Sequence, residues 1–268
     1  MIGGTRRIAH GVRWRAAAIG NLYREANAAE RLALTRYALA ELRGLLSPRG
    51  TREAWIRLGG RWFLLALGRY EIAGYLDVWI RRAYEQVAGF SPGSGSLIVD
   101  VGANVGFYTI RHAARGASVV AVEPNPQART RLEKALVRNK LDAEVIACAA
   151  GAAPGVATLV VGGSTLTGSL QQGADGRERH EVPVRTLDAI LAGNRDVVDV
   201  LKLDTEGSER DILLGAPATL ARTARVVMEF HSEELLRQSA ELLARQGLRH
   251  VLTQGSVAYF GREGVAAS

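Results

Sequence analysis

Cysteine, lysine and long apolar runs are scarce in this sequence. Its 268 residues include one cysteine, Cys148, so no disulfide can form within the chain. One cysteine and five scattered histidines also cannot build a metal cluster of Cys and His ligands. No run of 18 apolar residues occurs, so no membrane-spanning helix is expected. The first 20 residues lack a continuous apolar core and make a poor signal peptide, so we expect a cytoplasmic protein.

Positive charge is concentrated in the first third of the chain. Residues 1–95 hold 15 Arg against 7 acidic residues, whereas residues 96–268 hold 19 Lys and Arg against 20 acidic residues. A general preference for arginine explains the excess, since only three basic residues are lysines. The alternative is that a basic patch attracts an anionic partner or a membrane surface.

The pattern of residues 1–95 predicts a helical extension with a short strand. Leucines recur at helical spacing over 21–46, residues 61–67 indicate a strand, and 72–90 show a second helical pattern. A Ser-, Pro- and Gly-rich linker follows at 91–96. We expect the residues of this extension before about Ser47 to serve docking or homodimer contact; the alternative is that the helix over 21–46 completes the core. It contains no recognised nucleic-acid motif, so no nucleic-acid partner is expected.

Residues 96–268 alternate short apolar runs with helical patterns, which predicts an α/β fold with a doubly wound, mostly parallel sheet. Helices are expected from about Gly106 and over 126–140, 208–214 and 233–246. The parallel strands are expected at 96–102, 118–124, 143–151, 197–207 and 224–231, with strands of a connecting excursion at 156–162 and 180–191, and a closing pair at 249–254 and 256–262.

A glycine motif follows the first of these strands. The stretch "VDVGANVGFY" has the spacing D-x-G-x-x-x-G, formed by Asp100, Gly102 and Gly106. Glycines at a strand end indicate a sharp turn or the close approach of another segment or a ligand. The dinucleotide fingerprint is absent, because Asn104 stands where its second glycine is needed. Glu123 ends the second strand, where an acid can accept hydrogen bonds from both ribose hydroxyls. These observations favour S-adenosylmethionine, a nucleoside without a pyrophosphate.

Five blocks in order carry a family resemblance: "VDVGANVGFYT", "AVEPNP", "VPVRTLDAIL", "VLKLDTEGSERDILLGA" and "MEFH". Together they resemble the FkbM family of S-adenosylmethionine-dependent methyltransferases, and Tyr84-Glu85 resembles the family's lead-in. The resemblance implies a Rossmann-like class I methyltransferase sheet of seven strands, with an antiparallel final hairpin strand, over residues 96–268. It also implies O-methylation of a sugar, a glycosylated metabolite or a natural-product scaffold. The implied cofactor-binding residues are Asp100, Gly102, Ala103, Asn104, Gly106, Phe107, Glu123, Pro124, Cys148, Ala149 and Asp204.

Four titratable residues are candidates for catalysis. Asp204 and Glu206 follow the fourth parallel strand, and Glu229 and His231 share one face at the end of the fifth. Transfer of a methyl group to an alcohol needs a base, and an ordinary histidine matches neutral pH better than an ordinary aspartate. We therefore expect His231 to take the proton and Asp204 to orient the acceptor or the imidazole. The three carboxylates also suit a divalent cation, although nothing in the sequence requires one.

Two other classes of function are compatible with parts of the sequence. A nicotinamide-dependent oxidoreductase uses a similar sheet, but the missing glycine and the "DTEG" block disfavour it. A non-catalytic basic module would bind an anionic partner through the N-terminal third with strong salt dependence. The sequence does not identify the methyl acceptor, because fold analogy does not specify a substrate.

Overall fold

The computed structural model describes residues 52–58, 61–67, 74–161, 168–169, 178–194 and 196–263. The chain divides into two compact units, Met1–Ile72 and Ala73–Ser268. Residues 73–95, which the sequence grouped with the extension, therefore belong to the larger unit. No helix in the described ranges is long and apolar enough to cross a membrane.

The smaller unit contains an antiparallel hairpin. Strand β1 (Arg52–Leu58) pairs with β2 (Arg61–Leu67) along its whole length. The strand expected at 61–67 is β2, whereas its partner β1 was not expected from the sequence. The helical pattern at 21–46 and the proposed dimer contact lie outside the described residues.

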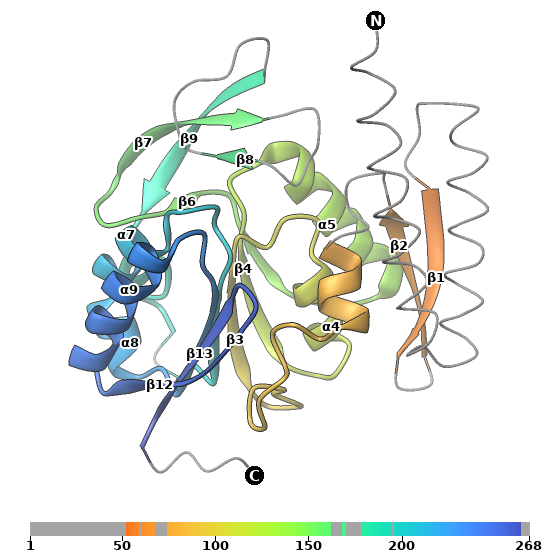
Figure 1. Ribbon diagram of the computed structural model, residues 1–268. Helices are drawn as coiled ribbons and strands as arrows, with labels where there is room; N and C mark the ends of the chain where they lie inside the picture. Colours follow the sequence, from red (N-terminus) through yellow and green to blue (C-terminus); the bar gives the residue numbers. More distant parts are fainter. Residues whose placement is uncertain are drawn as a thin grey trace, which may run out of the picture. The chain divides into compact units, whose positions relative to one another are not determined.

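A seven-stranded sheet forms the centre of the larger unit (Figure 1). Strands β11, β10, β3, β4 and β5 run parallel, and the closing hairpin joins β11 through antiparallel β13. This confirms the mostly parallel sheet with an antiparallel closing hairpin that the sequence predicts. The order across the sheet is β12 (Leu248–Gln254), β13 (Val257–Arg262), β11 (Arg225–Glu229), β10 (Val200–Leu203), β3 (Leu97–Val101), β4 (Ser118–Val122) and β5 (Glu144–Ile146).

Helices cover both faces of this sheet, so its central strands β3 and β10 are mostly apolar, apart from Asp100 and Lys202. Every residue of β3 and β10 is buried. Helix α5 begins at Pro126 because the Asn125 side chain accepts hydrogen bonds from the N–H groups of Gln127 and Ala128. Figure 1 shows α4 (Phe107–Ala113) and α5 (Pro126–Asn139) on one face, and α7 (Glu209–Leu214), α8 (Pro217–Ala221) and α9 (Glu233–Arg245) on the other.

The third predicted strand is shorter than expected. Its sheet pairing ends at Ile146, and Ala149–Ala150 form β6 of a separate four-stranded sheet. Two strands expected in the connecting excursion belong to this second sheet, and the short helix α6 (Leu187–Ile190) follows it. The order of the second sheet is β6 (Ala149–Ala150), β9 (Glu178–Arg185), β7 (Gly155–Val161) and β8 (Gly168–Ser169).

The helix predicted over 72–90 is only partly present. In the described part, residues 74–80 are helical, ending in the π-helix η1 (Leu76–Ile80), and irregular chain follows over 81–90. The apolar side chains that suggested a helix are buried by tertiary packing, Trp79 among them at 5% exposure. Arg82 then adopts a left-handed conformation with φ of 53°, which a helix cannot continue through.

Candidate active site

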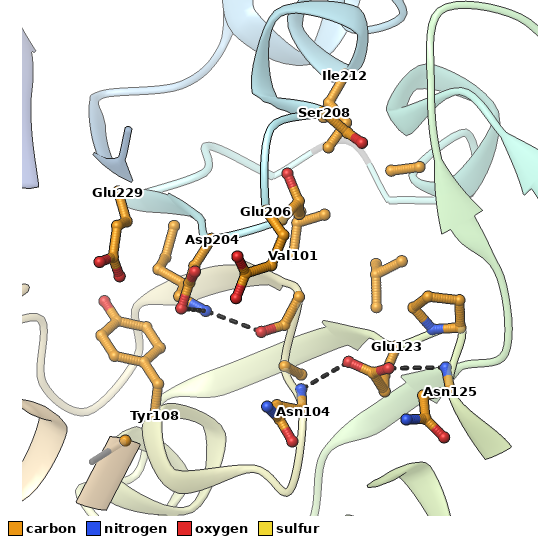
Figure 2. A pocket seen from close by; sticks show the side chains of 18 of the residues that line it. Val101, Asn104, Tyr108, Glu123, Asn125, Asp204, Glu206, Ser208, Ile212 and Glu229 are labelled. Carbon is orange, nitrogen blue, oxygen red and sulfur yellow. Dashed lines mark hydrogen bonds and ion pairs between the residues drawn. The ribbon is translucent and has the colours of Figure 1, made fainter. Parts of the chain in front are cut away.

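A cavity of about 250 Å³ opens where the parallel strands of the main sheet end at their carboxyl termini. Such a position is where open α/β sheets bind ligands. Figure 2 shows Glu229 and Asp204 toward one end of the view and Glu123 toward the other. The lining residues include Tyr84, Gly102, Ala103, Asn104, Phe107, Tyr108, Glu123, Pro124, Asn125, Ala149, Ala150, Lys202, Asp204, Thr205, Glu206, Glu229 and His231.

The two glycines of the motif are required by the packing of the chain on itself. Gly102 has φ of 75°, and a Cβ there would lie 1.9 Å from the carbonyl oxygen of Asp204. Gly106 has φ of 87°, and a Cβ there would lie 2.1 Å from Cδ1 of Leu132 on α5. The close approach inferred from the sequence is therefore one between protein segments. Gly102 also lines the cavity, whereas Gly106 does not.

Glu123 holds the glycine loop against the end of β4. Its two carboxylate oxygens accept hydrogen bonds from the N–H groups of Asn104 and Asn125, each at 2.7 Å (Figure 2). The residue is only 6% exposed, and burial raises its pKa to about 7 against the opposing effect of these two N–H donors. The side chain therefore shapes the loop and also faces the cavity.

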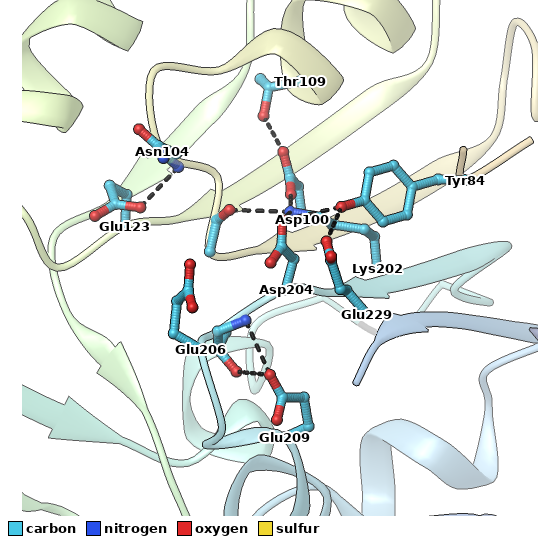
Figure 3. A network of polar contacts seen from close by, with 12 residues as sticks. Tyr84, Asp100, Asn104, Thr109, Glu123, Lys202, Asp204, Glu206, Glu209 and Glu229 are labelled. Atoms are coloured by element: carbon cyan, nitrogen blue, oxygen red, sulfur yellow. Dashed lines mark hydrogen bonds and ion pairs between the residues drawn. The ribbon is translucent and has the colours of Figure 1, made fainter. Parts of the chain in front are cut away.

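A buried lysine joins the ends of β3 and β10. Nζ of Lys202 lies 3.1 Å from Oδ1 of Asp100 and 3.5 Å from Oδ2 of Asp204, and donates to the carbonyl of Gly102 at 2.9 Å (Figure 3). Burial alone would lower the pKa of Lys202, but the carboxylates of Asp100 and Asp204 outweigh burial and raise it. Asp100 also accepts a hydrogen bond of 2.7 Å from Thr109. The sequence predicted cofactor contact for Asp100, yet Asp100 does not line the cavity. It instead supports the glycine loop through Lys202, which contacts both Asp100 and the carbonyl of Gly102.

The loop after β10 presents Asp204 and Glu206 to the cavity. Glu206 has φ of 54°, a conformation that costs energy for a residue with a Cβ. Fully buried Glu209 holds the loop by accepting hydrogen bonds from the N–H groups of Thr205 and Gly207, both 3.1 Å. The sequence indicated only a helix-start acid at Glu209, so this anchoring role emerges from the structure.

His231 lies between two carboxylates. Its Nε2 is 3.3 Å from Oε2 of Glu206, and its Nδ1 is 3.4 Å from Oε1 of Glu209. Burial raises the pKa of Glu206, and His231 opposes that shift. Asp204, which the sequence made the alternative partner of this imidazole, is held instead by Lys202 and Tyr84.

Tyr84 is one of the lining residues that sequence reasoning did not assign to the site. Its hydroxyl lies 3.0 Å from Oδ2 of Asp204 and 2.9 Å from Oε2 of Glu229 (Figure 3). Ser256 donates to the other oxygen of Glu229 at 3.0 Å. Burial, followed by the charge of Asp204, raises the pKa of Glu229. The only sequence signal for Tyr84 was the "YE" pair before the first parallel strand.

Two further predictions concern the adenine edge and metal binding. Ala149 lines the cavity as expected, whereas Cys148 is 1% exposed and lies outside the lining. In the described part of the chain, no three His, Cys, Asp or Glu side chains are grouped so as to hold a metal ion.

Known proteins share parts of this sequence. Residues 100–249 match the model of the methyltransferase FkbM domain. The AMB antimetabolite synthetase AmbE of Pseudomonas aeruginosa is 27% identical over 226 residues, a match that covers 68% of this chain and 10% of that protein. The chain thus spans about a tenth of the length of this curated relative.

Solved structures resemble this one at low sequence identity. Aeropyrum pernix fibrillarin, solved with S-adenosyl-L-methionine, is 12% identical with a TM-score of 0.47, covering 81% of this chain and 86% of its own. TYW2 of M. jannaschii, solved with AdoMet, is 16% identical with a TM-score of 0.43, and the match covers 80% of this chain and 88% of that chain. Because the family model matches more than half of the sequence, this chain belongs to the FkbM family of methyltransferases.

Proposed function

We propose that this chain is an S-adenosylmethionine-dependent methyltransferase that acts on a hydroxyl group of a sugar, a glycosylated metabolite or a natural-product scaffold. One observation carries the proposal: a single cavity is lined both by the glycine loop with Glu123 and by Asp204, Glu206, Glu229 and His231. Family membership supports the reaction class. The name of the relative, an antimetabolite synthetase, supports a natural-product acceptor.

The cofactor half of the cavity fits a nucleoside. The two N–H donors use one lone pair on each oxygen of Glu123, and a carboxylate offers about four such sites. The remaining sites suit two ribose hydroxyls. Ala149 and Ala150 provide a small apolar wall beside this end. When bound, S-adenosylmethionine supplies an electrophilic methyl group on a sulfonium.

The acceptor half requires positioning and a base. Buried Glu209 can accept from Nδ1–H of His231, which leaves Nε2 to take the proton of the acceptor hydroxyl. Glu206, 3.3 Å from Nε2, then pairs with the imidazolium. In this reaction the acceptor oxygen would take the methyl group as the methyl–sulfur bond breaks, S-adenosylhomocysteine would be the leaving group, and the acceptor proton would move to His231.

The test is a search for methylated products by mass spectrometry. The protein is incubated with methyl-labelled S-adenosylmethionine and a panel of sugars, glycosylated metabolites and natural-product alcohols, with magnesium or with EDTA. We expect a label-dependent mass increase on a hydroxyl-bearing compound. Exclusive labelling of nitrogen or carbon would contradict O-methylation.

Cofactor choice is tested separately by thermal shift. S-adenosylhomocysteine should stabilise the protein and NAD should not, since the loop lacks the dinucleotide fingerprint. Replacing Glu123 by Ala should weaken S-adenosylhomocysteine binding at least about tenfold, because two hydrogen bonds to a charged group are lost. Stabilisation by NAD alone would overturn the proposal.

A further inference from the structure

Tyr84 is held firmly although its segment has no regular secondary structure. The hydroxyl of Tyr259 on β13 donates to the carbonyl of Ala83 and accepts from the N–H of Gln86. Glu85 pairs with the buried guanidinium of Arg111 on α4. Residues on both sides of Tyr84 are thus tied to different elements, which directs the phenol ring into the site.

The ring of Tyr84 is also fixed in place, because neighbouring side chains pack against it. It is 4% exposed and meets the ring of Tyr108 edge-on, with centroids 5.7 Å apart. Nζ of Lys202 lies 5.5 Å from the centre of the Tyr84 ring. These contacts leave the hydroxyl between two carboxyl groups that follow adjacent parallel strands, β10 and β11 (Figure 3).

The number of protons in this arrangement is limited. A phenol has one O–H, which can point at either Asp204 or Glu229 but not at both. Two contacts of hydrogen-bond length therefore need a second proton, carried by one of the carboxyl groups. Asp204 has the ammonium of Lys202 within 3.5 Å and is the better stabilised carboxylate. Among the described residues, the hydrogen-bond donors to Glu229 are the uncharged hydroxyls of Tyr84 and Ser256, so the proton is assigned to Glu229.

The same contacts define which atom of Asp204 is left for a substrate. The hydrogen bond of Tyr84 and the nearest approach of Lys202 are both to Oδ2. We propose that Tyr84 is a positioning residue whose hydroxyl couples the carboxyl groups of Asp204 and Glu229, so that the two share one proton and Oδ1 of Asp204 serves the acceptor. The coupling stands on the geometry alone, and the role toward an acceptor rests on the proposed function. The charged and titratable groups around the pair are Lys202, Asp100, Glu206, His231 and Tyr108.

The coupling is tested without any reaction, by carbon NMR titration of the labelled carboxyl groups of the full chain. Replacing Tyr84 by Phe should raise the titration midpoint of Glu229, because its ionised form loses a donor. It should also change the carboxyl resonance of Asp204. In the comparison variant Ser256→Ala, Glu229 loses a donor while Tyr84 stays in place, so the Asp204 resonance should still follow the titration of Glu229, whereas in Tyr84→Phe it should not.

A variant that leaves Tyr84 in place provides a second measurement. Asp204→Asn removes the charge beside Glu229, so the Glu229 midpoint should fall toward that of an ordinary glutamate. Unchanged midpoints of Glu229 in both Tyr84→Phe and Asp204→Asn would overturn the coupling.

The role toward the acceptor is tested by kinetics once a methylated acceptor is known. Tyr84→Phe should raise the KM for the acceptor about 10- to 100-fold while calorimetry shows unchanged S-adenosylhomocysteine affinity. A Tyr84→Phe variant with wild-type acceptor KM would refute the positioning role. If the wild type methylates nothing, the proposed function fails, while the NMR result still decides the coupling.

Discussion

Replacing Gly102 by Ala should damage both the stability and the site of this protein. Gly102 has φ of 75°, and its added Cβ would lie 1.9 Å from the carbonyl oxygen of Asp204. An ordinary contact of a Cβ begins near 3.4 Å, so the two backbones must separate by about 1.5 Å. Neither atom belongs to a flexible side chain, so the strain falls on the ends of β3 and β10, which carry the site.

The expected loss of unfolding free energy has two parts, and substitutions at two other glycines measure these parts separately. A left-handed conformation costs a residue with a Cβ roughly 1–2 kcal/mol, and overpacking adds roughly 1–3 kcal/mol. Gly95 has φ of 83°, and a Cβ added there would meet no atom within 4 Å, so Gly95→Ala isolates the first cost. A Cβ added at Gly155 would meet no atom within 4 Å, and φ there is not positive. The unfolding free energy of Gly155→Ala should therefore stay within about 0.5 kcal/mol of the wild type.

The assay is urea unfolding of the three variants and the wild type, with calorimetry of S-adenosylhomocysteine binding. We expect the free energy of unfolding to fall by about 2–5 kcal/mol for Gly102→Ala and by about 1–2 kcal/mol for Gly95→Ala. Only Gly102→Ala should also lose ligand affinity. Equal stability of the Gly102→Ala and Gly95→Ala variants would refute the argument that the Asp204 carbonyl excludes a side chain.

Three further predictions follow from the site. Glu123 has a pKa raised to about 7 in the fold, so the folded state binds more protons than the unfolded state between about pH 4.5 and 7, and stability falls as pH rises through this window. Glu123→Gln should remove roughly 3 kcal/mol of that fall, measured by urea unfolding across the window, and an unchanged pH profile would contradict the assignment. Lys202→Met should cost about 3–5 kcal/mol of unfolding free energy, because buried Asp100 loses its cation; a loss below about 1 kcal/mol would argue against that pairing. His231→Ala should slow single-turnover methylation about 10²- to 10⁴-fold with cofactor affinity nearly unchanged. If His231→Ala keeps full activity while Asp204→Asn is inactive, Asp204 is the base instead of His231.

Several features of the fold could be predicted from local sequence alone. The buried strands β3 and β10 are apolar runs apart from Asp100 and Lys202, and Asn125-Pro126 marks the start of α5 through a cap that needs only neighbouring residues. The glycine spacing and the acid after the second strand predicted residues that line one cavity, Gly102 and Glu123, since parallel strands bring their carboxyl ends together. Patterns of this kind depend on a few adjacent residues, so one sequence suffices to read them.

Other features depend on which distant residues meet, and only the tertiary structure decided them. Residues 72–90 have helical spacing, but packing against the main sheet overrides that preference and leaves irregular chain after η1. Tyr84 lies 120 residues before Asp204 and 145 before Glu229, so no local pattern reports their contact. Gly102 was expected to face another segment or a ligand, and the choice depended on how β3 and β10 are placed side by side. Periodicity determined which residues are buried, whereas sheet register determined which of them touch.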